Sequence, residues 1–533
     1  MKKRYSILFF LIFTIQYLSA QRYDNAWLFS EEGSKNIPDI QCKGFCDGFV
    51  LSFEPNGIKF TPKSLKMDMA DSNASICDKE GNLQCYTNGW FIRNYLGDQI
   101  DNGDTLNKPT ETDDWSFDSN NLNYGGSGSS YFIPDSDTIG LFYLFHQKGS
   151  RSEINIEGVA GYYKYFLVTK VDMRQNGGKG KVVYMNKELY RQPSSTAVHI
   201  KHGNGKYWWA VIPNLQPINY YIHLINKDSI LQSSIQKPDK SYPDSVIGYG
   251  QKCFSLDGSL YADCNSFIGP RVFQFDRCTG KMTLYKQHIW KAFESGRYDL
   301  GPNGVAISPN NRFLYLTYSD TLTQYDLEAP DFVKSRVVLH KGQPYRFTKG
   351  WNFPYDTLGV FRGLSHGPDG KIYVLGDPLG TEIYVINKPN EKGIACDFCA
   401  RNCMSTPFFT YGNPQFPNYR LGPLKGSPCD TILGVANKDI KPEDYGIKLF
   451  PNPSSTIIKI DITIPQYDPL IKTEVVLVDV SGAIVMRYVM PDFAYIAELD
   501  ISKLPSGVYG VQLRQPQKFG TRVLATEKLV VID

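Results

Sequence analysis

The sequence lacks several features that would place it in a common functional class. Its 533 residues carry a formal net charge of only +3, and no run of Lys and Arg follows the first few residues, so no nucleic-acid partner is expected. After residue 20, no stretch is apolar enough to span a bilayer as a helix of about 20 residues. The catalytic motifs Gly-x-Ser-x-Gly and His-Glu-x-x-His and the phosphate-binding loop are also missing. The sequence therefore gives no direct sign of enzyme chemistry, and we expect no cofactor.

Residues that favour short strands and tight turns are abundant. Aromatic residues make up 14% of the chain, and it contains 46 Gly and 32 Pro. Aromatic side chains suit pleated surfaces, whereas Gly and Pro suit corners. Hydrophobic residues reach 42%, which is ample for packed cores, and the length predicts roughly two to four domains. The composition therefore favours an all-β protein.

The N-terminus has the pattern of a secretion signal. Met-Lys-Lys-Arg is followed by an apolar stretch and then by the small residues Ser19 and Ala20. We predict that residues 1–20 form a signal peptide that is cleaved after Ala20. No Cys follows this position, so a lipoprotein anchor is not expected.

From about residue 40 to 430 the chain repeats one pattern: a strand, a polar turn and an aromatic strand. The turn centres are Gly81, Asp137, Gly205, Gly258, Asn311 and Gly370. A period of roughly 50 to 70 residues with one hairpin per unit is typical of a β-propeller. We predict a propeller over residues 21–430 with six to eight blades, of which seven fits best. The seventh blade would form where Gly48–Phe60 pairs with the tail around Phe408. A β-sandwich, or a pair of smaller β domains, is the alternative.

Two of these hairpins resemble a known family. Ser-Pro-Asn-Asn-Arg-Phe-Leu-Tyr, from Ser308, and Gly-Pro-Asp-Gly-Lys-Ile-Tyr-Val, from Gly367, are similar to hairpins of lactonase-like and WD-repeat-like propellers of extracellular bacterial proteins. This resemblance covers most of the middle of the chain. It implies an architecture but no particular activity.

The pattern changes after a predicted linker at residues 431–446. Residues 447–533 contain alternating apolar strands, which predict a small antiparallel Ig-like sandwich. Four blocks resemble the C-terminal sorting domain (type A) of type IX secretion substrates, in the family's order: Leu449–Ser455, Asp479–Gly482, Leu499–Tyr509 and Glu527–Val530.

The resemblance implies that an outer-membrane translocon of Bacteroidota-type bacteria recognises this domain. A surface sortase would then remove it, and the cargo would be secreted or attached to the cell surface. The residues that carry the sorting motif would be Pro451, Asn452, Pro453, Asp479, Gly482, Leu504, Pro505, Gly507, Tyr509, Lys528 and Leu529.

The 11 cysteines agree with an oxidising compartment. Hairpin-like spacing predicts the disulfides Cys77–Cys85 and Cys253–Cys264, and Cys42 and Cys46 would close a small loop. The odd count leaves one thiol unpaired, for which Cys278 is the candidate. Disulfides are also favoured for the late cluster, although its Cys-x-x-Cys spacing also allows zinc: Cys396, Cys399, Cys403 and Cys429.

Two classes of function stay open for the propeller. We favour a non-catalytic module that binds a surface or extracellular ligand or serves as a scaffold, because propellers present many loops on a rigid disc. The alternative is a hydrolase or lactonase-like enzyme with its site in the axial channel, where Asn303, His366 and Asp369 would lie. His199 and His202 are three positions apart in a strand and its turn, so we expect them on opposite faces and not at one metal. No catalytic or metal-binding residue is therefore assigned.

Overall fold

The computed structural model is built of antiparallel β-sheets, in agreement with the all-β prediction. It describes residues 21–30, 38–39, 44–45, 47–54, 57–69, 73–104, 106–107, 130–148, 163–214, 219–237, 250–265, 268–290, 303–318, 321–341, 361, 363–376, 382–400, 403–406, 414–430, 445–464, 472–490, 494–516 and 521–532. These ranges contain no α-helix, and short 3₁₀ turns occur at Asn176–Gly178 and Gly393–Cys396. A helix able to cross a membrane is not found in them.

Seven sheets follow one another in the described part of residues 26–399. The first three sheets are β1 (Ala26–Ser30), β4 (Gly48–Glu54) and β5 (Gly57–Lys63); β6 (Ala74–Cys77), β7 (Leu83–Thr87) and β8 (Ile92–Asn94); and β9 (Ser130–Pro134), β10 (Leu141–Lys148), β11 (Tyr163–Asp172) and β12 (Lys181–Ser194). A separate two-stranded ribbon pairs β2 (Pro38–Asp39) with β3 (Gly44–Phe45).

The other four sheets each have four strands in chain order. They are β13 (Val198–Lys201), β14 (Trp208–Pro213), β15 (Tyr220–Asn226) and β16 (Ser229–Gln236); β17 (Lys252–Phe254), β18 (Leu260–Asn265), β19 (Gly269–Phe275) and β20 (Met282–Gln287); β21 (Gly304–Ile307), β22 (Phe313–Tyr318), β23 (Thr321–Asp326) and β24 (Val337–Lys341); and β25 (Gly363–His366), β26 (Ile372–Leu375), β27 (Ile383–Ile386) and β28 (Phe398–Cys399).

The predicted turns connect the first and second strands of six of these sheets. Five turn centres have positive φ, namely 97° at Gly81, 70° at Gly205, 74° at Gly258, 62° at Asn311 and 76° at Gly370. Gly and Asn tolerate this region better than other residues, which explains why they recur at these positions. The repeat in the sequence is therefore the repeat of the hairpins.

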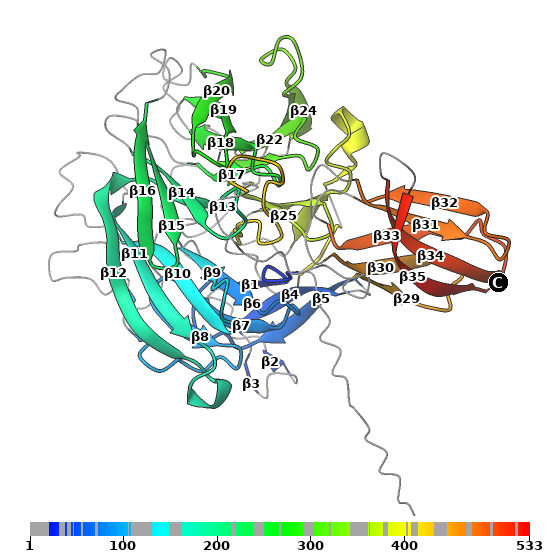
Figure 1. The fold of residues 1–533 in the computed structure, drawn as a ribbon, viewed down its shortest axis with the longest axis horizontal. Helices are drawn as coiled ribbons and strands as arrows, with labels where there is room; N and C mark the ends of the chain where they lie inside the picture. The colour runs from blue at the N-terminus through cyan, green and yellow to red at the C-terminus, as the bar shows by residue number, and fades with distance from the viewer. Residues whose placement is uncertain are drawn as a thin grey trace, which may run out of the picture.

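The first strands of the sheets line up side by side around a common centre (Figure 1). Strand β6 lies against β1 and β9, and β17 lies against β13 and β21, which in turn contacts β25. Apolar clusters fill the spaces between neighbouring sheets, and one cluster joins Trp27 and Phe53 of the first sheet to Tyr373 of the last. This closed arrangement is a β-propeller, and its seven sheets are consistent with the seven blades expected.

The first sheet does not test the predicted pairing of Gly48–Phe60 with the tail around Phe408. Its described strands, β1, β4 and β5, all come from the N-terminal part of the chain. Phe408 lies outside the described residues. Among the described strands, the two ends of the propeller therefore meet through side-chain packing and share no sheet.

The C-terminal strands form a sandwich of two antiparallel sheets beside the propeller (Figure 1). One sheet has the order β29 (Gly446–Phe450), β30 (Ile457–Thr463) and β33 (Ile496–Asp500). The other has the order β32 (Ile484–Val489), β31 (Glu474–Val478), β34 (Gly507–Pro516) and β35 (Thr521–Val531). Residues that alternate along these strands are buried between the sheets, as the apolar alternation predicted.

Candidate functional site

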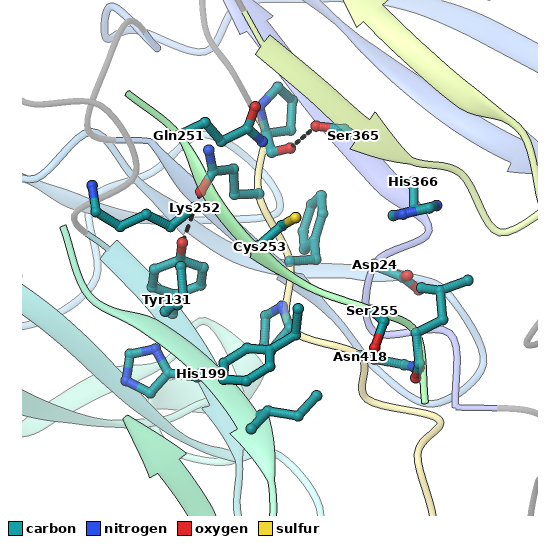
Figure 2. Close-up of a pocket in the computed structure, with 18 of the residues that line it drawn as sticks. Asp24, Tyr131, His199, Gln251, Lys252, Cys253, Ser255, Ser365, His366 and Asn418 are labelled. Carbon is teal, nitrogen blue, oxygen red and sulfur yellow. Dashed lines mark hydrogen bonds between the residues drawn. The ribbon is translucent and has the colours of Figure 1, made fainter. Parts of the chain in front are cut away.

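A small cavity of about 80 Å³ lies at the centre of the propeller, where an axial site would be expected (Figure 2). Four first strands line it: β9 with Tyr131, β13 with His199, β17 with Lys252 and Cys253, and β25 with Ser365 and His366. Its remaining wall comes from Asp24, from Gln251, Ser255 and Leu256 beside β17, and from residues 414–418 and 420. The volume lies well below the range of about 300–1,000 Å³ typical of sites for small-molecule ligands.

The segment 414–420, which we call the axial segment, fills much of the centre and is bonded to several blades. The Asn418 side chain donates to the carbonyl of Leu256 at 2.6 Å, and the Tyr419 hydroxyl donates to the carbonyl of Phe132 at 2.7 Å. The Ser365 hydroxyl donates to the carbonyl of Pro414 at 2.6 Å. The axial segment therefore forms hydrogen bonds with polar groups of the blades that could otherwise bind a ligand.

The Tyr131 hydroxyl also faces this segment and donates to the Gln415 side chain at 2.8 Å. Of the described residues that line the cavity, only Asp24 carries a carboxylate, and its two oxygens lie 2.7 and 2.8 Å from Nη1 of Arg420. Both side chains of this ion pair are nearly buried. The acidic group of the cavity is therefore neutralised within the protein.

The histidines of the cavity are held in their neutral form. Burial lowers the pKa of His199 to about 3 and that of His366 to about 4. His199 packs against the rings of Tyr131 and Phe145, and neither of its ring nitrogens has a hydrogen-bond partner among the described residues. Burial also lowers the pKa of Lys252, whose ammonium donates to the carbonyl of Gly250 at 2.9 Å.

The structure separates the three residues considered for an axial enzyme site. His366 lines the cavity, whereas the backbone of Asn303 bonds to Gln251 and Thr317 at 2.8 Å each. Asp369 lines a different pocket of about 770 Å³ between the propeller and the sandwich. Its carboxylate accepts a hydrogen bond from the Tyr373 hydroxyl at 2.7 Å, and burial raises its pKa. These three side chains therefore do not form one site.

The described residues also contain no group of three His, Cys, Asp or Glu side chains that could hold a metal ion. His199 lines the cavity, whereas the Nε2 atom of His202 lies 3.0 Å from the carbonyl of Cys278. The two histidines are thus directed to different places, as their spacing predicted. The axial segment was missed by the sequence analysis because nothing in its local pattern shows that it packs at the centre.

The cysteine pairs differ from those predicted. Cys77, Cys85, Cys253 and Cys264 are free thiols, so the predicted pairs Cys77–Cys85 and Cys253–Cys264 are wrong for this structure. In the first hairpin, a register shift between Ile76 and Cys77 places Cys85 opposite Ile76. In the second, Cys253 pairs with Ala262, and Cys264 lies opposite Pro270 on the next strand.

Two other disulfides are formed within the part of the chain that the structure describes. Cys278 is bonded to Cys429, with a Cα–Cα distance of 5.5 Å, so the expectation that Cys278 is unpaired was wrong. Cys399 is bonded to Cys403, and Cys396 is a free thiol. The described residues of the late cluster therefore do not form a zinc site. Cys42 and Cys46 lie outside the described residues. The Cys278–Cys429 bond ties the chain just after the axial segment to the turn between β19 and β20.

The residues of the predicted sorting motif gather at one end of the sandwich. The Asn452 side chain donates to the carbonyl of Lys528 at 2.6 Å and accepts from the backbone of Val530 at 2.9 Å. Strand pairing places Tyr509 opposite Leu529, and Val478, next to Asp479, opposite Gly510. This end carries the C-terminus and lies away from the propeller (Figure 1).

Several motif residues also have structural roles. One Asp479 oxygen accepts the backbone N–H groups of Ser481 and Ala483, at 2.9 Å each, in a turn where Gly482 has a φ of 85°. The Tyr509 hydroxyl donates to the carbonyl of Pro505 at 2.7 Å. Leu529 is buried, and Leu504 packs on the same apolar cluster. In contrast, the exposed motif residues are Pro451, Asn452, Pro453, Gly482, Pro505, Gly507 and Lys528.

The fold thus defines a class: a β-propeller followed by a C-terminal β-sandwich. Residues 448–531 match the family described as the secretion system C-terminal sorting domain. The chain therefore carries a type IX sorting domain, which directs export through the periplasm to a secreted or cell-surface location. This domain engages the type IX secretion machinery.

Solved propellers are similar to the chain only at a low level. A putative 6-phosphogluconolactonase from Bacteroides fragilis has 12% identity and a TM-score of 0.31, with 54% of this chain and 87% of that chain covered. A periplasmic gluconolactonase from Pseudomonas aeruginosa has 13% identity and a TM-score of 0.31, with 71% and 89% covered. The Cps50 (Swd1) propeller domain from Myceliophteria thermophila has 11% identity and a TM-score of 0.33, with 66% and 93% covered. These scores carry no argument about activity. No curated protein matches the sequence.

Proposed function

We propose that the propeller is a non-catalytic binding or scaffold module, delivered to the cell surface or released by type IX secretion. The observation that carries this proposal is the filled axis: the cavity of about 80 Å³ is bounded by the axial segment, and its carboxylate is paired with Arg420. A hydrolase would need an open pocket with convergent catalytic groups at this place. The rigid ring then serves to present the loops that connect its strands.

The proposed organisation is a signal peptide at residues 1–20, a propeller at 21–430, a linker at 431–446 and a sorting domain at 447–533. The proposed recognition surface is the motif end of the sandwich, which contains Asn452, Asp479, Gly482 and Lys528. Its position away from the propeller supports this proposal because a translocon could reach it while the cargo stays folded.

Cell fractionation of point variants tests the sorting role without removing a domain. Lys528 is exposed, and its backbone carbonyl, not its side chain, holds Asn452. Lys528→Ala therefore should leave the fold intact and cause the protein to accumulate in the periplasm. Val523→Ala, at a side chain 47% exposed on the same strand, is the matched control and should be exported normally. Normal export of Lys528→Ala would remove this residue from the recognition surface.

The non-catalytic role is tested by activity screening of the purified protein against lactones and other hydrolysable substrates. His199→Leu and His366→Leu change the two histidines of the cavity at similar volume. We expect no turnover that depends on either residue. An activity that is present in the wild type and lost in these variants would favour the hydrolase alternative and overturn the proposal.

A further inference from the structure

The sandwich is packed on the propeller at the place where the two ends of the ring meet. Tyr495, which directly precedes β33, is only 2% exposed. Its hydroxyl donates to the Asn25 side chain at 3.1 Å, just before the first strand of the propeller. Its backbone N–H donates to the carbonyl of Pro368 at 3.0 Å, in the hairpin turn of the seventh sheet. One residue of the sandwich therefore contacts both the first and the last sheet of the ring.

Two arginines of the propeller surround the same aromatic ring. The guanidinium carbons of Arg22 and Arg420 lie 4.7 and 5.3 Å from the centroid of Tyr495, within the range of cation–π contacts. Arg22 also pairs with Asp461 of β30, which is 3% exposed. Burial raises the pKa of Asp461, so the ionised carboxylate depends on the arginine beside it. We call Tyr495, Arg22, Arg420 and Asp461 the clamp.

The clamp borders an apolar contact that runs through both parts of the chain. One cluster contains Trp27 and Phe53 of the first sheet, Tyr373 of the seventh, and Ile460 and Ile496 of the sandwich. Buried Tyr and Arg side chains that are surrounded by apolar residues contribute most of the binding affinity in many protein interfaces. The contact therefore has the composition of a stable interface.

The ring has a particular need for such a contact. Among the described strands, no sheet contains strands from both ends of the propeller, and the described residues of the first and seventh sheets meet at the seam through side-chain packing. Many closed β-structures avoid free edges by joining their termini in one sheet. Here the sandwich packs across the seam through Tyr495, which contacts both Asn25 and Pro368.

We propose that the sorting domain has a second role as a clasp that closes the propeller, and that it remains bound by the clamp when the connecting chain is cut. Release of the domain from the cargo then requires separation of the clamp in addition to cleavage of the chain. Deletion of the sorting domain exposes the seam. A deletion variant therefore loses both the sorting signal and part of the stability of the propeller. This role does not depend on what the propeller binds.

The test uses the full-length chain with a specific protease site inserted between residues 431 and 444. The purified protein is cut and then passed over a size-exclusion column at low micromolar concentration. We expect the two wild-type fragments to elute together, and Tyr495→Ala to separate with a dissociation constant about 100-fold higher. Ile484→Ala, an exposed position next to the motif end, is the matched control and should elute like the wild type.

Three further single variants and one double variant guard against misfolding of Tyr495→Ala. Tyr495→Phe removes only the hydrogen bond to Asn25 and should weaken the association by about 10-fold. Arg22→Asp and Asp461→Arg should each separate the fragments, and their combination should restore part of the association because the pair is re-formed with reversed charges. Separation of the wild-type fragments on the column would overturn the proposal, as would Tyr495→Ala fragments that stay together. Because the assay is done on purified protein, its outcome is independent of the secretion experiment.

Discussion

Nη1 of Arg420 lies 2.7 and 2.8 Å from the two carboxylate oxygens of Asp24, although the two residues are 396 positions apart in the chain. Arg420 ends the axial segment, and Asp24 stands just before β1. The ion pair therefore fixes the segment at the centre of the ring to the start of the propeller. Both side chains are at most 10% exposed, so water screens this interaction little.

Removal of one partner should reveal how much the structure depends on this pair. Asp24→Asn keeps the shape of the side chain but leaves the Arg420 charge buried without its counter-ion. We expect the free energy of unfolding to fall by about 3–5 kcal/mol, measured by denaturant titration. The exposed pair Glu188–Arg191 provides the control, because Arg191→Ala should change stability by less than about 1 kcal/mol. Equal effects of the two variants would contradict the role assigned to Asp24.

The disulfide assignment predicts a definite alkylation pattern. In denaturant without reductant, Cys77, Cys85, Cys253, Cys264 and Cys396 should react, and Cys278, Cys399, Cys403 and Cys429 should be protected. In the folded protein the free thiols should react slowly, because burial raises their pKa, to about 12 for Cys253. Peptide mass spectrometry reads out both conditions. Detection of a peptide linking Cys77 to Cys85 would show that the hairpin pair forms after all.

Stability should fall in mildly acidic solution because of buried neutral histidines. Burial lowers the pKa of His146 and His199 from 6.5 to about 3 in the folded protein. Below pH 6.5 these histidines bind protons in the unfolded chain but not in the folded protein. The stabilisation present above pH 6.5 is therefore lost as the pH falls towards the pKa of the histidines in the folded protein. Each histidine should contribute a slope of up to about 1.4 kcal/mol per pH unit.

The variant His199→Phe isolates one of these contributions. Its ring packs where the imidazole lies against Tyr131, Phe145 and Phe166, so the core remains filled. We expect the dependence of unfolding free energy on pH between 6.5 and 4 to become shallower by about 1 kcal/mol per pH unit. The measurement is a series of denaturant titrations at fixed ionic strength. A slope identical to that of the wild type would mean that His199 is not buried in its neutral form.

The features that could be predicted from the sequence are local ones. Hairpin turns such as those at Gly205 and Gly258 are visible because a positive φ selects Gly or Asn at one position of each repeat. The strands of the sandwich are visible because apolar residues recur along them and are buried between its two sheets. Both signals depend on residues close together in the chain.

The features that were missed depend on contacts between distant residues. The register shift beside Cys77 moves a single residue and breaks the symmetry that predicted a disulfide with Cys85. The Cys278–Cys429 bond joins residues separated by 151 positions, and Tyr495 meets Asn25 at a separation of 470. No periodicity in the sequence reports such contacts, so neither the filled axis nor the clamp could be derived before the fold was known.

The repeated hairpin turn also permits a test of how tightly the blades pack. Gly258 has a φ of 74°, and a Cβ atom there would lie 2.8 Å from the Arg277 side chain and 2.9 Å from Ile200. Gly393 has a φ of 61°, and a Cβ atom there would meet nothing within 4 Å.

Both Ala substitutions carry the cost of the left-handed backbone, about 1–2 kcal/mol, but only Gly258→Ala should add a packing cost of about 1–3 kcal/mol. We therefore expect the unfolding midpoint of Gly258→Ala in denaturant to lie clearly below that of Gly393→Ala. Equal midpoints would mean that the neighbouring blades yield at this turn, and that backbone conformation alone selects glycine there.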